Sequence, residues 1–372
     1  MKFKINRNEL ERGLSRVKAA IDGRAALPII RGVKMEVQKP DALYLTATNL
    51  DNTIRVKVEV EAAVDGVTAV DYNRLAAVVS SLPECPVSAQ FKTKGKSNFL
   101  ELVCDGCRSL ITAQDPAEYP RIAEVKGGKA AKIEAKEIAG AFNFVRHAFS
   151  DDDTRKNLMG ALVEVSNGKI VAVGTDGKRM AVYGGIEEPG KDTRSAIIPA
   201  KLVNAILEAV KNSSGVLSVT TDGNQILVED GELWSVQGKL YADAPYKWRQ
   251  VVPRRADNHI AVDRYELADN FSRASRGEEM AGVWPCVKMT LKAGRIVIDS
   301  NGAECEMHTE MPCKYDGEEV VILLNPDYVV QSLNAATDDE VRIGFNDGYS
   351  PITVESANGP VETIMPLRVS GN

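Results

Sequence analysis

The sequence predicts an α+β protein made of three repeated domains, each with two helices and an antiparallel sheet. Three observations support this. One amphipathic helix pattern recurs at intervals of 128 and 126 residues, a second recurs near the start of each third of the chain, and alternating segments with turn residues lie between and after them. A period of this length is too long for a solenoid repeat of about 20–50 residues. It corresponds to a small domain present in three copies.

Two amphipathic helices are predicted in each third. The first has apolar residues at offsets 0, 4, 7 and 11 and the second mostly at offsets 0, 3, 4 and 7, which keeps one stripe of each helix facing a core. The first is marked by Leu10, Leu14, Val17 and Ile21, by Ile138, Phe142, Val145 and Phe149, and by Leu267, Phe271 and Ala274. The second is marked by Leu75, Val78, Val79 and Leu82, by Val203, Ile206, Leu207 and Val210, and by Val329, Ser332, Leu333 and Ala336.

Strands are predicted between and after these helices. Segments 46–49, 173–176 and 298–301 occupy equivalent places in the three copies, and hairpin-like runs at 99–103, 225–229 and 350–354 follow the second helices. Period-two alternation bounded by Gly, Asn and Asp is typical of antiparallel strands. This order of elements predicts helices on one face of a sheet.

Connectors at 124–129 and 253–258 separate the copies, so we expect domains at 1–125, 130–253 and 257–372. Short connectors should hold these domains in a fixed relation. With 372 residues and 44% hydrophobic content, the chain can form three ordinary cores. The N-terminus has no apolar signal segment and no stretch approaches the ~18 apolar residues of a membrane span, so we expect a soluble cytoplasmic protein without membrane association.

Cys104 and Cys107 have CxxC spacing among six scattered cysteines. The Asp105-Gly106 pair between them, with apolar flanks, is a hairpin turn signal, so we expect two thiols on a hairpin. The alternative is a metal or redox role. The sequence has no second CxxC, which argues against a zinc site.

Basic residues follow the predicted helices although the net charge is −6. The negative sum by itself opposes nucleic-acid binding, but the distribution of charge matters more. Arg12 and Arg16 fall on the helix face away from Leu10, and Arg7 and Lys18 flank them. The ordinary alternative is a solvated helix face, and neighbouring acidic residues dilute the basic bias.

The number of helices points to a ring of two chains. A dimer of three two-helix domains would line its hole with about twelve helices, whose axes, about 8–10 Å apart, form a circle roughly 35 Å across. Subtracting a helix diameter of about 10–12 Å leaves a hole of order 24 Å, wide enough for a nucleic-acid duplex. A single chain would leave a hole that is too small.

The whole chain resembles the bacterial sliding clamp, the beta subunit of DNA polymerase III. The motifs that carry the resemblance are Arg24-Ala25-Ala26-Leu27-Pro28-Ile29, Thr175-Asp176-Gly177-Lys178-Arg179-Met180-Ala181-Val182 and Met365-Pro366-Leu367-Arg368. The resemblance implies three DNA-clamp domains per chain and a six-domain ring, a head-to-tail homodimer that encircles double-stranded DNA without sequence preference. Such a ring tethers polymerase and makes replication processive.

The resemblance also implies a set of protein partners and a non-catalytic role. Expected partners are the DNA polymerase III alpha subunit, a clamp loader that opens the ring with ATP, and other polymerases and repair proteins that carry clamp-binding peptides. No catalytic residues, no metal and no cofactor are implied.

Partner peptides are expected in a cleft between the second and third domains. The resemblance assigns to it Leu158, Thr175, Gly177, Lys178, Arg179, Met180, Pro245, Arg249, Val251, Asn325, Tyr328, Pro351, Met365, Pro366, Leu367 and Arg368. Adaptable Met and Leu side chains with a few polar groups suit such a site. For Met365-Pro366-Leu367 the alternative is a terminal strand that closes the core. Lys178 replaces a common His, Met180 a common Leu, and the segment from Pro245 to Arg249 is one residue longer, which bears on the affinity for particular peptides.

Two further sets of residues are expected to act in the ring. For DNA, the resemblance places Arg24 in a loop that reaches toward the duplex, and helix-face position adds Arg7, Arg12, Lys136, Arg146, Lys201 and Arg273. These should contact phosphates, since a sliding ring must not read sequence. The dimer interface is expected to pair free sheet edges, with Arg74, Val78, Arg108 and Ile111 exposed on one side and Glu304, Glu306 and Glu310 on the other. Opposite charges would fix the register.

An enzyme is poorly supported, because the sequence has no GxSxG, Walker or HExxH motif and its three histidines, His147, His259 and His308, lie in different elements. The acidic run 151–153 could hold magnesium, but a solvated loop after Phe149 is the simpler interpretation. A second rival is a three-module scaffold that never touches nucleic acid, consistent with the acidic net charge. Retention on circular against linearised DNA would separate a clamp from a scaffold.

Overall fold

The computed structural model describes residues 1–368 except 128–129, 167, 189, 191, 212, 254–255, 278, 282–283, 303 and 358. It divides into two compact units, Met1–Ala139 with Lys201–Leu240, and Gly140–Ala200 with Tyr241–Asn372. Both contain helices and antiparallel sheets, which confirms the α+β class. The domain boundaries stay a prediction, because segment 130–253 contributes strands to the sheets of both units. Positions 128–129 and 254–255 of the expected connectors lie outside the described residues.

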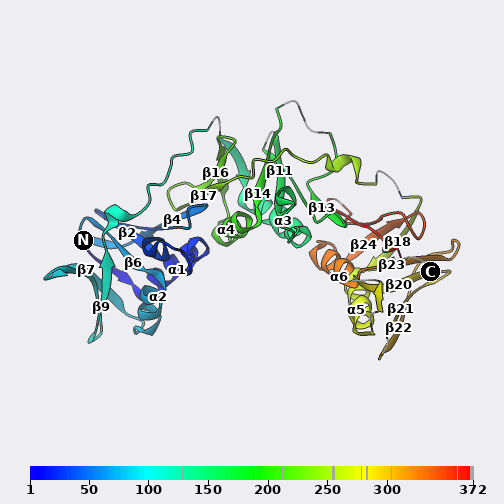
Figure 1. Ribbon diagram of the computed structural model, residues 1–372, viewed down its shortest axis with the longest axis horizontal. Helices are drawn as coiled ribbons and strands as arrows, with labels where there is room; N and C mark the ends of the chain where they lie inside the picture. Colours follow the sequence, from blue (N-terminus) through cyan, green and yellow to red (C-terminus); the bar gives the residue numbers. More distant parts are fainter. Residues whose placement is uncertain are drawn as a thin grey trace. The chain divides into compact units, whose positions relative to one another are not determined.

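The first unit is built on an antiparallel sheet that runs through thirteen strands of the described chain (Figure 1). The order across it is β10 (Ala131–Glu134), β15 (Val216–Thr221), β16 (Gln225–Asp230), β17 (Trp234–Lys239), β4 (Asn52–Glu59), β3 (Ala42–Thr48), β2 (Gly32–Gln38), β6 (Gly66–Asp71), β9 (Cys107–Gln114), β8 (Ser97–Cys104), β7 (Pro86–Lys94), β1 (Lys2–Asn6) and β5 (Glu61–Val64). The pairing of β4 with β17 runs from Asn52↔Gly238 to Val56↔Trp234. It joins segments that are far apart in the sequence into one sheet.

Helices α1 (Arg7–Val17) and α2 (Tyr72–Ser81) contact each other in the first unit, and α1 lies on β3 and β4. Each begins at a side-chain cap. Asn6 accepts a hydrogen bond from the Asn8 amide at 2.9 Å, and Asp71 accepts one from the Arg74 amide at 2.9 Å. Such caps satisfy amides that have no partner within the helix. The apolar stripe of α1 is buried as its spacing predicts.

The second unit contains two antiparallel sheets. The larger has the order β14 (Arg194–Pro199), β11 (Gly160–Ser166), β12 (Lys169–Thr175), β13 (Arg179–Tyr183), β26 (Val361–Ile364), β25 (Ile352–Glu355), β24 (Glu340–Phe345) and β18 (Asn258–Asp263). The smaller has the order β19 (Glu279–Ala281), β20 (Trp284–Lys292), β21 (Arg295–Asn301) and β22 (Glu306–Pro312), and β23 (Val320–Leu324) pairs with β20.

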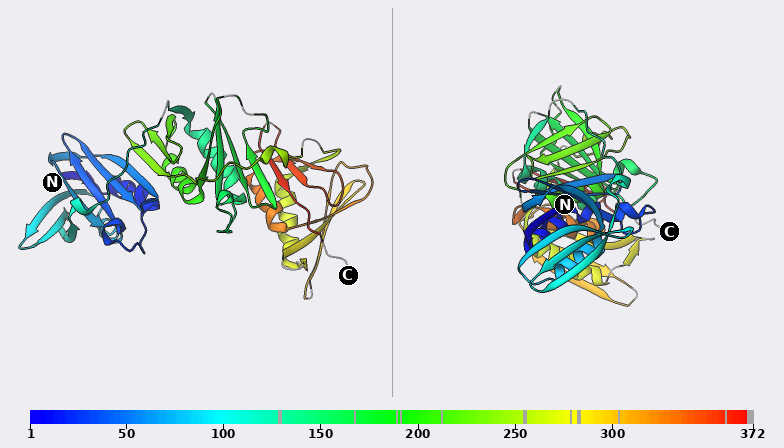
Figure 2. Two further views of the ribbon diagram at one scale, coloured as in Figure 1. Left: turned by 45° about the horizontal axis from the view of Figure 1, so that its top comes forward. Right: turned by 90° about the vertical axis from the view of Figure 1, so that its left-hand side faces the viewer.

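Helices α5 (Arg264–Ala274) and α6 (Pro326–Ala335) lie side by side against the smaller sheet (Figures 1 and 2). Asp263 and Asn325 cap them by accepting hydrogen bonds from the Glu266 and Asp327 amides. Their inner faces meet the sheets in one apolar core that includes Phe271, Leu333 and Phe345. This core anchors the elements that carry the functional site.

The remaining helices are α3 (Ala135–Val145) and α4 (Ala200–Val210). All six predicted helices are therefore confirmed. Ile21 and Phe149 lie just beyond short 3-10 turns that follow α1 and α3. The predicted strand at 350–354 begins two residues later, because Ser350 belongs to a turn in which it donates hydrogen bonds to Asp347.

Candidate functional site

A surface cleft of about 280 Å³ lies in the second unit, beside the last strand of the chain. It is bordered by the β12–β13 turn, by segment 246–251 and by the residues around the end of β26. Leu158 and Met180 in it are buried, whereas Val251 is 56% and Met365 39% exposed. An apolar floor with exposed apolar side chains at its mouth is suited to the side chains of an extended peptide. The cleft is lined by Arg155, Asn157, Leu158, Thr175, Gly177, Lys178, Arg179, Met180, Tyr246, Lys247, Trp248, Val251, Thr363 and Met365.

The turn between β12 and β13 is fixed by its own side chains. Asp176 Oδ1 accepts hydrogen bonds from the amides of Lys178 and Arg179 at 2.8 and 3.0 Å. Thr175 Oγ1 accepts from the Gly177 amide at 3.0 Å and donates to the Arg179 carbonyl. Gly177 has φ +89°, a left-handed value that favours glycine. The motif Thr175-Asp176-Gly177 therefore builds one wall through local hydrogen bonds.

The C-terminal segment reaches the cleft because β26 pairs with β13, with Arg179 opposite Ile364. The Met365 amide donates to the Lys178 carbonyl at 2.9 Å, and the Leu367 amide donates to the Leu323 carbonyl at 2.7 Å. The residues after the strand are thus held between two elements. Strand β26 lies between β13 and β25 and ends at Ile364, so Met365-Pro366-Leu367 follow the strand and do not form a terminal strand that closes the core. Met365 lines the cleft.

Arg179 lies in the wall and is only 8% exposed. Its guanidinium donates to Asp176, to Gln331 and to the His147 carbonyl, and it stacks over Tyr328 at 4.4 Å from the ring centroid. Burial raises the pKa of Tyr328, and the nearby Asp176 charge adds to this. The guanidinium of Arg179 is therefore bonded to groups of the protein itself, and these contacts hold the wall in place.

The predicted cleft residues fall into two groups. Leu158, Thr175, Gly177, Lys178, Arg179, Met180, Val251 and Met365 line the cleft together. Pro245, Arg249, Asn325, Tyr328, Pro351, Pro366, Leu367 and Arg368 are not among its lining residues. Tyr328 stands behind Arg179, and Asn325 is buried as the cap of α6. Arg249 points away, toward Glu164 and the Glu187 carbonyl.

Six lining residues were not predicted: Arg155, Asn157, Tyr246, Lys247, Trp248 and Thr363. Thr363 could have been found from the alternation of β26. The Trp248 ring packs on strands β11 to β13 with Leu162 and Val173. No motif marks such a contact, because it depends on how segment 246–251 folds back on the sheet.

The predicted DNA-contacting residues are exposed, with one exception. In the first unit Arg12, Arg24, Lys136 and Lys201 reach solvent, as do Arg146 and Arg273 in the second. Arg7 does not fit the expectation, because its side chain is only 14% exposed. It donates to the carbonyls of Val79 and Ser80 at 3.2 and 2.8 Å and so ties α1 to the end of α2.

Of the expected interface residues, Arg74 and Val78 lie on helix α2 and the others on or beside strands β9 and β22. Arg74 is exposed, but Val78 is half-buried. Strand β9 pairs with β6 only through Ala113 and Gln114, so in the described chain residues 107–112 of β9 have a strand partner on one side only. Ile111 is 5% exposed and faces the core, so it was wrongly expected to be exposed; its neighbour Leu110 is 39% exposed. Arg108 is exposed but already binds Glu101 at 2.6 Å. Glu304, Glu306 and Glu310 are exposed on or beside the outer strand β22.

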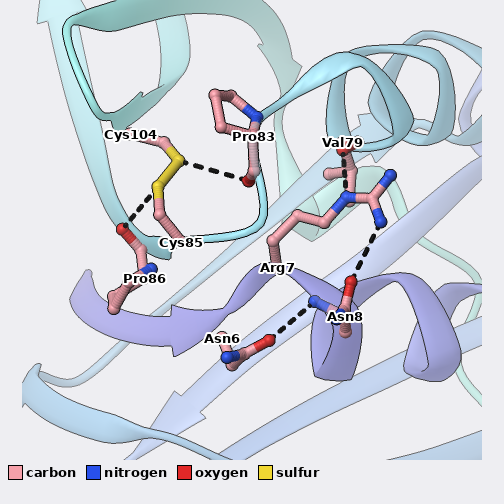
Figure 3. Close-up of a disulfide and its surroundings, with 8 residues drawn as sticks. All are labelled: Asn6, Arg7, Asn8, Val79, Pro83, Cys85, Pro86 and Cys104. Carbon is pink, nitrogen blue, oxygen red and sulfur yellow. Dashed lines mark hydrogen bonds between the residues drawn. A yellow bond between two sulfur atoms is a disulfide. The ribbon is translucent and has the colours of Figure 1, made fainter.

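The hairpin of Cys104 and Cys107 forms as predicted, with Asp105 and Gly106 at φ +43° and +78°. The expectation of two thiols is wrong for Cys104, which forms a disulfide with Cys85 (Figure 3). The loop after α2 brings Cys85 to the end of β8, with a Cα–Cα distance of 6.4 Å, within the usual range. Cys107 remains a free, exposed thiol.

Two features of the described residues bear on the rival interpretations. Within the described residues, no group of three or more His, Cys, Asp or Glu side chains is placed to hold a metal ion. Asp152 instead accepts hydrogen bonds from Thr154, which lower its pKa and close a local turn. No helix in the described part of the chain is both long and apolar enough to span a bilayer.

The arrangement of sheets and helices matches solved sliding clamps. A DNA polymerase III beta subunit from Pseudomonas aeruginosa superposes with a TM-score of 0.89 at 23% identity over 99% of this chain and 100% of that one. A sliding clamp from Bacillus subtilis gives 0.89 at 21% identity, with 99% of each chain covered. The fold is thus that of the DNA sliding clamps.

Family models give a narrower assignment. Models of the N-terminal, central and C-terminal domains of the DNA polymerase III beta subunit match residues 1–123, 132–241 and 249–368. The beta sliding clamp of Pseudomonas putida is 26% identical over 379 residues, covering 99% of this chain and all of that protein. That of Chlamydia muridarum is 25% identical over 374 residues, covering 99% of each. The chain belongs to the DNA polymerase III beta subunit family of sliding clamps.

Proposed function

We propose that this chain is a sliding clamp that encircles duplex DNA and confers processivity on the replicative DNA polymerase. Two copies would join head to tail into a six-domain ring, with domains at 1–125, 130–253 and 257–372. The observation that carries the proposal is family membership along the whole chain. Sliding clamps are non-catalytic processivity factors, so the role is mechanical. In this role the protein would act on DNA in the bacterial cytoplasm.

Exposed basic residues on the helices and in the loop of Arg24 would face the DNA. The proposed contacts are Arg12, Arg24, Lys136, Arg146, Lys201 and Arg273, whereas the largely buried Arg7 is not among them. Arg12, Lys136 and Arg273 each have an acidic neighbour within 3.4 Å. Such neighbours weaken the hold on any single phosphate, which suits a ring that slides.

Ring closure would pair strand edges of the two chains. The open side of β9, with Arg74 and Arg108 nearby, is the proposed partner of β22, which carries Glu306 and Glu310. An unpaired edge strand is a liability that another strand can cover. The charges have opposite sign, which favours the head-to-tail register over the alternatives.

The cleft beside β26 would hold short peptides from partners such as the DNA polymerase III alpha subunit, the clamp loader, and other polymerases and repair proteins. Its apolar floor offers pockets for apolar anchors, and Met180 and Met365 can adapt to different side chains. No cofactor is required for this role.

A primer-extension assay tests the function. On a long, singly primed circular template with polymerase, clamp loader and ATP, the protein should lengthen the products made in one binding event. A chain ending at Ile364 should lose this effect, because Met365 is removed from the cleft, whereas a chain ending at Arg368 should retain it. Products of unchanged length with the full chain would contradict the proposal.

A further inference from the structure

Segment 246–251 forms one wall of the cleft without being part of any sheet. Its short 3-10 turn (Trp248–Gln250) is followed by Val251 at the mouth. The segment must therefore be held on the sheet by side chains. Trp248 is 2% exposed and packs with Met180 and Val252 in a small core. Tyr246 adds a hydrogen bond from its hydroxyl to the Val173 carbonyl at 3.3 Å.

A single carboxylate ties this segment to strand β11. Glu164 Oε1 accepts hydrogen bonds from Trp248 Nε1 at 3.2 Å and from an Arg249 guanidinium nitrogen at 2.9 Å, and Oε2 accepts from a second Arg249 nitrogen at 2.6 Å. Both side chains of the ion pair are largely buried, at 12% and 15% exposed. A two-pronged contact of this kind fixes orientation as well as distance.

Arg249 completes the arrangement by covering the indole. Its guanidinium carbon lies 4.0 Å from the centroid of the Trp248 ring, and its Nε donates to the Glu187 carbonyl at 2.8 Å. Glu164 thus holds both the edge of the ring and the group stacked on its face. Trp248 is itself a lining residue of the cleft. The position of the Glu164 carboxylate therefore determines the position of this wall of the cleft.

We propose that Glu164 is a positioning residue for the peptide cleft: it sets the place of Trp248 through one direct hydrogen bond and through Arg249, which it binds twice and which stacks on the indole, and so controls the affinity for partner peptides without touching them. The inference rests on the proposed function in one respect, that the cleft binds peptides. It adds a residue that neither the repeat nor the motifs of the sequence indicate.

The test is a binding titration by fluorescence polarisation with a labelled peptide copied from the clamp-binding segment of a DNA polymerase III alpha subunit. Glu164→Gln in the full chain should weaken binding about tenfold or more, equivalent to a loss of roughly 1.4 kcal/mol. Asp299→Asn is the matched control, because Asp299 also binds two partners, Lys288 at 3.2 Å and His308 at 2.7 Å, but none of the three lines the cleft. It should leave the affinity unchanged.

Two readouts separate positioning from general stability. The tryptophan emission of Glu164→Gln should shift toward that of a solvated indole, and the shift should vanish when Trp248→Phe is added. Burial would raise the pKa of Glu164, but the hydrogen bonds and charge of Arg249 and Trp248 hold it below its ordinary 4.5. The difference in peptide affinity between the wild type and Glu164→Gln should therefore be constant above pH 4.5. It should disappear as the pH falls through the lowered pKa of Glu164.

A second variant keeps the inference testable if Glu164→Gln does not fold. Arg249→Lys preserves the charge but loses the two-pronged contact and the planar stack, and should also weaken the peptide while Asp299→Asn does not. Native affinity in a folded Glu164 or Arg249 variant would overturn the inference and leave the proposed function intact. A wild-type chain that does not bind the peptide would overturn both.

Discussion

Arg7 and Arg12 lie on the same helix and carry the same charge, yet the structure gives them different tasks. Arg7 binds two carbonyls at the end of α2 and an ion-pair partner, Glu11, at 2.9 Å. Arg12 is 72% exposed and pairs with Glu9 one turn away. Hydrogen bonds from a charged group to the carbonyls at a helix end contribute to stability, whereas exposed ion pairs contribute little.

Exchanging each arginine for alanine should therefore separate stability from DNA binding. Arg7→Ala is expected to lower the free energy of unfolding by about 1.5–3 kcal/mol, and Arg12→Ala by no more than about 0.5 kcal/mol. The effects on DNA binding should be the reverse: Arg12→Ala should bind DNA more weakly than the wild type, and Arg7→Ala should bind it about as well. Urea unfolding and a salt titration of DNA binding measure the two. Equal losses of stability would contradict this assignment.

Among single residues, the lining of the cleft was predicted through the resemblance, which does not depend on closeness in the sequence. It assigned to the cleft the turn from Thr175 to Met180 and also the distant Leu158, Val251 and Met365, and the structure brings these residues together. Trp248 and Glu164 could not be predicted, because they meet only when a segment 84 residues further along folds back on β11. The resemblance assigned Arg249 to the cleft, but its guanidinium is directed to Glu164 and the Glu187 carbonyl, because a resemblance gives a position in the chain and not the orientation of a side chain in a loop.

Among the elements, the helices were predicted best. Their apolar spacing follows from burial of one face, so the pattern survives whatever the helix packs against. The order of the sheets could not be derived in the same way. The pairings of β4 with β17 and of β13 with β26 join residues roughly 180 positions apart in the sequence. Alternation of apolar and polar residues predicts a strand but not the strand with which it pairs.

The disulfide is an element-scale feature that links the loop after α2 to β8. It closes a loop with a sequence separation of 19 residues, for which the loss of chain entropy in the unfolded state corresponds to about 3 kcal/mol. Cys85→Ser should lower the free energy of unfolding by about this amount under non-reducing conditions, and Cys107→Ser should not. Urea unfolding with and without a reductant measures it. A Cys85→Ser chain as stable as the oxidised wild type would refute the prediction.

The open edge of β9 gives a second prediction at this scale. Leu110 on β9 and Val103 on β8 are similarly exposed, at 39% and 38%, but only Leu110 lies on the edge strand. Leu110→Asp should weaken the dimer strongly, because a charge would be buried where the second chain adds its strand. Val103→Asp should have a smaller effect. Analytical ultracentrifugation compares the two, and equal dimer dissociation constants would argue against pairing through β9.

For the whole molecule, the threefold repeat explains why one chain offers two different sheet edges. Strand β9 belongs to the first repeat and β22 to the third. In a dimer, β9 of one chain could therefore pair with β22 of the second chain. The long period and the count of helices predicted a ring of two chains before any motif was considered. The sequence could not show which residues point outward at the edges, as the burial of Ile111 demonstrates.

Closure of the ring around DNA can be tested by the lifetime of the protein on DNA after loading, compared between a closed circle and the same DNA cut once. A ring that is closed by two chains should stay on the circle for many minutes and leave the cut molecule rapidly by sliding off its ends, at any salt concentration that preserves the dimer. Equal lifetimes on both forms would show that the protein binds the surface of the duplex instead of enclosing it, and would contradict the account.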